Sequence, residues 1–328
     1  MDADNRVKVA EGHWDALPAW RSQMPPRARW NESFQIVRDQ NFRICGKYLD
    51  GENTGLVDLF KQVAGAHLPL AKAISVGCGT GAKEMRLIQA GVVSHFHLCD
   101  LSSVSLEQGK QIAQEWGLSD KVSFAHGNAF DNIKNQEYDL VYWDNALHHM
   151  PSADDAVRWS LEILRPGAWF LMTEFVGANR FQWTEEAVEL INAVRNSLND
   201  ECFHNPRDPE HPWPRHFRRP TLEEMEYDPS ESVDAEAIIP ALNNYFPNAL
   251  IKHVGGTVYH VGLGDILTNI PEGSDILKLC LLLDRATASI PHYAVGIAQK
   301  PLRAKKLSAK WFTHMKSQFR RTFLGPKA

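Results

Sequence analysis

The sequence predicts an α/β fold built on a doubly wound, mostly parallel sheet. Between residues 71 and 175, short apolar runs typical of buried strands alternate with helix-like segments. Such alternation is typical of a parallel sheet that is covered by helices on both faces. A glycine-rich turn at residues 77–81 directly follows the first of these strands and opens a helix. In this fold class, that position can bring a ligand close to the backbone.

The expected elements follow one another along the chain. Residues 1–70 are helical or irregular, with a break at Met24-Pro25-Pro26 and a loose helical spacing of apolar residues over 30–48. Helices are predicted at 82–91, 103–117, 153–164 and 185–198. Strands are predicted at 73–76, 95–99, 122–125, 138–143, 168–175, 250–254, 257–261 and 293–298.

Three regions are therefore expected: an N-terminal helical extension (1–70), a Rossmann-like domain (71–301) and a tail (302–328). The domain contains an insertion around 200–247, rich in proline and histidine, which is long enough to form a lid or a wall of a site. The histidines and carboxylates of its loop are irregularly spaced, so we expect no metal site there.

Charge is unevenly distributed along the chain. The tail has eight of the 35 Lys and Arg residues and none of the 40 Asp and Glu, so residues 1–301 carry a formal charge of −13. An acidic body argues against a nucleic-acid partner. Apolar residues recur every fourth position in the tail, at Leu307, Trp311, Met315, Phe319 and Phe323. This pattern predicts a basic amphipathic helix that packs on the acidic body, lies on an anionic membrane or docks on a partner.

Several sequence features bear on the compartment. No apolar run is long enough to span a bilayer, and the N-terminus lacks the pattern of a secretory leader. The five cysteines are scattered and form no CxxC pair, which favours a reducing environment. We therefore expect a cytoplasmic protein. Its oligomeric state is left open.

Individual residues suggest a nucleoside-containing ligand. Gly77, Gly79 and Ala82 fit the G-x-G-x-x-A pattern of dinucleotide-binding turns. Asp100 ends the next strand, nineteen residues after Gly81, where a carboxylate can accept hydrogen bonds from ribose hydroxyls. The following strand leads into Asn128, whose amide could read an adenine edge. A nicotinamide oxidoreductase with the same turn is the alternative interpretation.

Together these segments resemble class I S-adenosylmethionine-dependent methyltransferases. The resemblance rests on VGCGTG (76–81), Asp100, Gly127-Asn128-Ala129, Asp144 to Met150 and Leu164 to Gly167, in that family's order. It implies S-adenosylmethionine as cofactor and a small-molecule substrate. The resemblance implies that Gly77, Cys78, Gly79 and Gly81 contact the methionine part of the cofactor and that Asp100 binds the ribose. It implies that Leu101, Asn128 and Ala129 contact adenine and that Asn145 also belongs to the cofactor site. In two departures from the family, Asn128 stands where Asp is common and Ala168 where glycine is common, so Asn128 would meet adenine through its side-chain carbonyl.

Three residues are candidates for the chemistry. The methyl acceptor is expected to be an O, N or S atom of a small molecule. His148 and His149 follow the fourth strand at its carboxyl end, where either could remove a proton from a hydroxyl or ammonium acceptor. Glu174, at the end of the fifth strand, could accept a proton, bind a cationic substrate or pair with Arg180. Tyr259 and His260 could also reach the acceptor.

Besides a methyltransferase and a nicotinamide oxidoreductase, a third interpretation is a cofactor-binding partner protein without activity.

Overall fold

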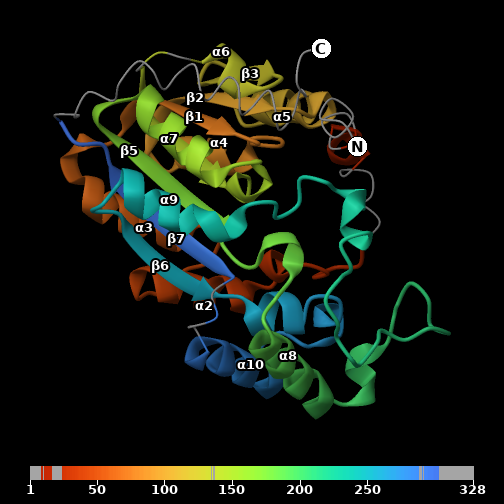
Figure 1. Ribbon diagram of the computed structural model, residues 1–328. Helices are drawn as coiled ribbons and strands as arrows, with labels where there is room; N and C mark the ends of the chain where they lie inside the picture. Colours follow the sequence, from red (N-terminus) through yellow and green to blue (C-terminus); the bar gives the residue numbers. More distant parts are fainter. Residues whose placement is uncertain are drawn as a thin grey trace.

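The computed structural model describes residues 9, 11–16, 24–133, 135, 137–287, 290 and 292–302. Within them lies a seven-stranded sheet of order β3-β2-β1-β4-β5-β7-β6 (Figure 1). Only β7 runs antiparallel to its neighbours. The strands are β1 (Leu70–Val76), β2 (Val93–Asp100), β3 (Val122–His126), β4 (Tyr138–Asp144), β5 (Leu164–Phe175), β6 (Leu250–Gly255) and β7 (Tyr293–Gln299). The α/β, mostly parallel fold is thus confirmed.

Helices cover both faces of this sheet. The helices α3 (Thr54–Ala64), α4 (Ala82–Gln89) and α5 (Ser103–Glu115) form one layer, and α7 (Ala153–Ile163) and α9 (Ile238–Tyr245) form the other. Neighbouring residues of β5 show the alternation. Trp169 packs on Phe60 of α3, with ring centroids 5.5 Å apart, whereas Phe170 packs on Phe246 after α9 at 5.3 Å. Residues of opposite faces alternate along a strand, so the sheet is wound on both sides.

Side-chain caps explain why several helices begin where they do. Ser102 caps α5, Ser152 caps α7 and Thr184 caps α8 (Glu185–Ser197), and each accepts a hydrogen bond from a backbone N–H in the first turn. Such caps satisfy amides that have no partner inside the helix. The predicted starts at 103, 153 and 185 are therefore confirmed.

The N-terminal region packs against the later part of the domain. Helix α2 (Phe34–Cys45) carries Arg43, whose guanidinium binds Asp39 of the same helix and Asp284 of α10 (Asp275–Ala286), each at 2.6 Å. Arg43 also donates to the carbonyl of Val254 in β6 at 2.9 Å. These three partners are nearly fully buried with it, so α2 and α10 share one interior with the edge of the sheet.

One predicted strand is wrong. Residues 257–261 form part of a π-helical turn, Thr257–Gly262, instead of a strand. Gly255 and Gly256 have φ of 80° and 121°, which turns the chain out of the sheet after β6. The buried Asp284 carboxylate then accepts from the N–H groups of Gly256 and Val258. The apolar run is buried without a strand partner because a side chain satisfies its backbone.

The insertion contains short 3-10 turns, η5 (Asp200–Phe203), η6 (Glu224–Tyr227) and η7 (Ala235–Ala237), followed by α9. Its last part folds back over η3 (Leu147–His149), where Val233 N–H donates to the His148 carbonyl at 3.2 Å. Arg180 fixes this segment by donating to the carbonyls of Asp228 and Glu231. The insertion thus contributes a wall beside the predicted histidines. Nothing among the described helices is long and apolar enough to cross a membrane. The predicted tail helix lies outside the described residues.

Candidate active site

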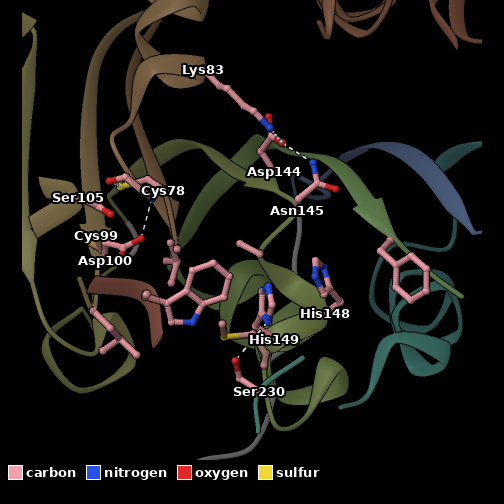
Figure 2. A pocket seen from close by; sticks show the side chains of 18 of the residues that line it. Cys78, Lys83, Cys99, Asp100, Ser105, Asp144, Asn145, His148, His149 and Ser230 are labelled. Atoms are coloured by element: carbon pink, nitrogen blue, oxygen red, sulfur yellow. Dashed lines mark hydrogen bonds and ion pairs between the residues drawn. The ribbon is translucent and has the colours of Figure 1, made fainter. Parts of the chain in front are cut away.

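A cavity of about 1650 Å³ lies at the carboxyl edge of the sheet. Figure 2 shows Asp100 and Cys78 on one side of it and His148 and His149 on the other. Of the residues predicted from the sequence, it is lined by Gly77, Cys78, Gly79, Asp100, Leu101, Asn128, Ala129, Asn145, His148 and His149. Gly81 and Glu174 do not line it.

The glycine turn adopts backbone conformations that favour glycine. Gly77, Gly79 and Gly81 have φ of 67°, 57° and 70°. A Cβ at Gly81 would lie 2.5 Å from Leu98 Cδ1, whereas one at Gly79 would meet nothing within 4 Å. Gly81 therefore serves the packing of the turn on β2, and Gly79 faces open space on the cavity side.

Asp100 holds this turn in place. Its Oδ2 accepts from the N–H of Gly79 and its Oδ1 from the N–H of Ser102, both at 2.7 Å. Burial raises the pKa of Asp100, and these backbone donors oppose the increase. A carboxylate oxygen has a second acceptor site, so Asp100 can position the turn and still receive hydrogen bonds from a ligand.

Asn128 has a structural task that the sequence did not reveal. Its Oδ1 accepts from Phe130 N–H and its Nδ2 donates to Asp131, both at 3.1 Å, which caps the short helix α6 (Ala129–Asn132). The side-chain carbonyl expected to meet adenine therefore also caps this helix.

A polar network at the end of β4 was also missed. Asp144 accepts from Lys83 Nζ at 2.7 Å and from Asn145 Nδ2 at 2.8 Å (Figure 2). Its other oxygen accepts from Tyr142 and Asn53, each at 2.7 Å. Asp144 and Lys83 both line the cavity. The network orients Asn145, whose φ of 51° is left-handed.

Glu174 acts behind the cavity wall. This fully buried carboxylate accepts from the N–H groups of Ala146, Leu147 and Phe175 at 2.7–2.9 Å, and from Nδ1 of His148. The suggested pair with Arg180 is wrong, because Arg180 binds carbonyls of the insertion. Glu174 therefore positions His148 and its loop and does not face the cavity.

The two histidines have different environments. His148 Nε2 lies 3.4 Å from Glu231 Oε1. Burial opposes its protonated form, but Glu174 and Glu231 outweigh that effect and raise the pKa of His148 to about 10. His149 Nδ1 lies 3.3 Å from Ser230 Oγ, and burial together with His148 lowers the pKa of His149.

Glu231, a further cavity residue, belongs to the irregular insertion, where no periodicity could identify it. Burial opposes its ionised form, but His149 and His148 outweigh that effect and lower the pKa of the Glu231 carboxyl to about 2. The open choice between Tyr259 and His260 has an answer as well. His260 lines the cavity, whereas Tyr259 is buried elsewhere against Gln40 and the Val254 carbonyl.

The rest of the wall near the histidines is largely aromatic. The Trp14 ring stands edge-on to His149 with centroids 4.7 Å apart. The other aromatic residues of the wall include Trp30, Phe175, Phe181 and Tyr293. Trp14 belongs to the helical residues 11–16, in which Asp15 also accepts from Ser102 Oγ at 2.6 Å. His13 Nε2 of the same segment lies 3.7 Å from Asp228 Oδ2.

Comparisons with known proteins agree with this geometry. Residues 69–224 match a family model described as a methyltransferase domain. The chain is 34% identical over 159 residues to the ubiquinone/menaquinone biosynthesis C-methyltransferase UbiE of Rhodopseudomonas palustris (strain TIE-1), which covers 44% of this chain and 62% of that protein. It is 32% identical over 107 residues to a probable tocopherol O-methyltransferase of Oryza sativa subsp. japonica, over 32% of this chain and 29% of that protein.

A solved structure shares the fold. The geranyl diphosphate C-methyltransferase of Streptomyces coelicolor A3(2), in complex with Mg²⁺, geranyl diphosphate and S-adenosyl-L-homocysteine, aligns with a TM-score of 0.52 and 12% identity, over 90% of this chain and 97% of that one. In sequence, the chain spans about 62% of the length of the UbiE protein of Rhodopseudomonas palustris. The family match and these relatives favour the methyltransferase interpretation over the nicotinamide oxidoreductase. Residues 69–224 are thus similar to methyltransferase domains, and together with these relatives they support a class I S-adenosylmethionine-dependent methyltransferase.

Proposed function

We propose that this protein transfers the methyl group of S-adenosylmethionine to an oxygen atom of a small molecule with an apolar, ring-bearing body. The observation that carries this proposal is the division of one cavity. The glycine turn and Asp100 lie on one side, and His148 and His149 lie on the other within a largely aromatic wall. Methyl transfer is an in-line displacement, and a shared cavity can hold the two reactants in line.

The proposed cofactor contacts follow the geometry of the turn. The backbone of Gly77, Cys78 and Gly79 faces the methionine part, and Asp100 accepts from the ribose hydroxyls. Leu101 and Ala129 pack against adenine, and Asn128 caps α6 beside it. Asn145, oriented by Asp144, completes the site, and Gly81 acts through packing alone.

The polar groups of the other side support an acceptor that has a proton to lose. His148, His149 and Glu231 converge there, and a thioether sulfur would have no use for them. A hydroxyl becomes a good nucleophile when its proton is removed. We assign the loss of that proton to this group, with Glu174 as a positioning residue for His148.

The aromatic wall supports a planar apolar body for the acceptor. Trp14, Trp30, Phe175, Phe181 and Tyr293 offer large apolar surfaces that stack on rings. The relatives named for ubiquinone/menaquinone and tocopherol biosynthesis are consistent with such an acceptor. A hydroxylated aromatic compound is therefore our first choice of substrate class.

Two measurements test this function. Calorimetric titration should show binding of S-adenosylmethionine and much weaker binding of NAD. Incubation with S-adenosylmethionine and a panel of hydroxylated aromatic compounds should release S-adenosylhomocysteine and add one methyl group to an acceptor oxygen. Tighter NAD binding would favour the oxidoreductase. Cofactor binding without turnover across phenol, amine and thiol panels would favour an inactive partner protein.

A further inference from the structure

Three side chains on the acceptor side form a group with the composition of a metal site. One donor atom from each of His148, His149 and Glu231 can be chosen so that all three lie within 4.8 Å of one another. Across the described part of the chain, no other group of three or more His, Cys, Asp or Glu residues meets this criterion. The side chains come from η3 and from the insertion, so the fold itself brings them together.

Both histidines are held from behind by polar partners. Glu174 accepts from Nδ1 of His148, which leaves Nε2 directed toward Glu231 at 3.4 Å. Nδ1 of His149 lies beside Ser230 Oγ, which in turn donates to Asp228 at 2.6 Å. Metal-binding histidines characteristically present one ring nitrogen to the ion and donate the other to a carboxylate or another polar group.

The surrounding charge also suits a cation. The fully buried carboxylates of Glu174 and Asp228 stand behind the two rings, and Glu231 lines the cavity beside His148. A metal ion bound at Nε2 would replace the proton of His148 and supply the positive charge that these carboxylates need in a low-dielectric interior. All three members of the group line the cavity, so an ion there would keep coordination positions open toward the acceptor.

We propose that His148, His149 and Glu231 bind a divalent transition-metal ion. Two imidazoles and one carboxylate suit Zn²⁺, Fe²⁺ or Co²⁺ better than Mg²⁺ or Ca²⁺, which prefer oxygen ligands throughout. The proposed site departs from the expectation of no metal ligand, which was argued from the loop at 202–216 alone.

The task of the ion rests on the proposed function. The acceptor hydroxyl binds at an open position, and the ion lowers its pKa so that the proton leaves to solvent. The resulting oxygen anion attacks the methyl carbon of S-adenosylmethionine. The C–S bond breaks with its electron pair remaining on sulfur, which yields the methyl ether and S-adenosylhomocysteine.

The test uses the full chain, dialysed against EDTA and titrated with Co²⁺ and then Zn²⁺. We expect one equivalent of Co²⁺ to bind with visible absorption bands that Zn²⁺ abolishes. His149→Ala and Glu231→Gln should each weaken Zn²⁺ affinity by about 100-fold or more, and Glu174→Gln by about 10–100-fold, because it removes only the outer partner. His211→Ala, at a highly exposed histidine of the insertion, should bind Zn²⁺ like the unaltered chain.

The affinity for S-adenosylmethionine is measured on the same samples. In the variants it shows whether the fold is intact, and in the unaltered chain it tests the cofactor of the proposed function. Variants that retain cofactor affinity but lose Zn²⁺ support the metal site. Absence of stoichiometric Co²⁺ and Zn²⁺ binding, or equal binding by His149→Ala and Glu231→Gln, overturns it. If the chain binds S-adenosylmethionine but no metal ion, the metal site is overturned and the proposed methyltransferase function stands. If it binds the metal ion but not S-adenosylmethionine, the proposed methyltransferase function is overturned and the metal site stands.

Discussion

Asp100 and Glu174 each hold a loop that lines the cavity, and Asp100 also faces the cavity itself. Asp100 accepts from the N–H of Gly79 in the glycine turn and from that of Ser102, the cap of α5, and Glu174 accepts from two N–H groups of the loop after β4. Each lies next to a residue that faces the cavity, Gly79 and His148 respectively. Substituting either carboxylate should therefore affect ligand contacts and loop geometry together.

Asp100→Ala should weaken S-adenosylmethionine binding by about 10–150-fold. Hydrogen bonds to a charged group are worth about 1.5–3 kcal/mol, and the loss also frees the N–H of Gly79. Isothermal titration measures the change, and circular dichroism checks that the fold is retained. Asp100→Asn, which keeps one acceptor oxygen, should lose less. Unchanged affinity in Asp100→Ala would remove this residue from the cofactor site.

His149→Ala should reduce turnover by about 10²–10⁴-fold. The reason is that His149 belongs to the group, with His148 and Glu231, at which the acceptor hydroxyl loses its proton. Cofactor affinity should be unchanged, since His149 lies across the cavity from Asp100 (Figure 2). Steady-state assays of S-adenosylhomocysteine formation give kcat and KM, and His211→Ala serves as the exposed control. Near-normal turnover in both His148→Ala and His149→Ala would exclude a role for the pair.

At the scale of elements, the contact between α5 and the glycine turn is unusually close. A Cβ added at Gly109 would lie 2.4 Å from the carbonyl oxygen of Thr80 and 2.8 Å from the Phe124 ring. Only glycine lets the helix approach the backbone of the turn this closely. The helix that begins at the Asp100 side of the cavity therefore supports the turn directly.

Gly109→Ala tests that contact. Alanine favours a helix over glycine by about 1 kcal/mol, but overpacking costs about 1–3 kcal/mol, so we expect net destabilisation and weaker cofactor binding. Urea unfolding and calorimetry measure the two effects. Gln111→Ala, on the exposed side of the same helix, should change stability by less than about 0.5 kcal/mol. A stabilised Gly109→Ala variant would contradict the close contact.

The elements also show how far the sequence could predict the structure. The strands up to Phe175 were predictable because each is a short apolar run next to a turn. The run at 257–261 looked the same, but Asp284, distant in sequence, satisfies its backbone in a π-helical turn. The acceptor side was only partly predictable, because Trp14 and Glu231 come from segments without periodicity. The roles of all these site residues stay predictions until they are tested.

At the scale of the molecule, Arg43 joins the N-terminal region to the last part of the domain. Its side chain, Asp39 and Asp284 are all less than 10% exposed. Arg43→Ala should lower the free energy of unfolding by about 3–5 kcal/mol, because it removes the cationic partner of the buried Asp284 carboxylate, whereas Asp39 keeps its ion pair with Arg285. Arg38→Ala, which breaks the exposed pair with Asp50, should cost no more than about 1 kcal/mol. Equal denaturation midpoints for the two variants would contradict this view.

A second prediction at this scale concerns the effect of the basic tail on stability. Deleting residues 302–328 should lower the melting temperature, because we expect the eight positive charges of the tail to stabilise a body of charge −13. The intact chain should not bind anionic phospholipid vesicles in sedimentation assays. An unchanged melting temperature together with vesicle binding by the intact chain would favour the membrane interpretation instead.

The helical residues 11–16 make two contacts, through Asp15 with Ser102, which follows the cavity residue Leu101, and through Trp14 with His149. A displacement that uncovers Ser102 therefore also takes Trp14 away from His149. We therefore expect departure of the spent cofactor and departure of the methylated product to be coupled. The enzyme would exchange both molecules in a single opening, so increased solvent viscosity should slow the two releases to the same extent.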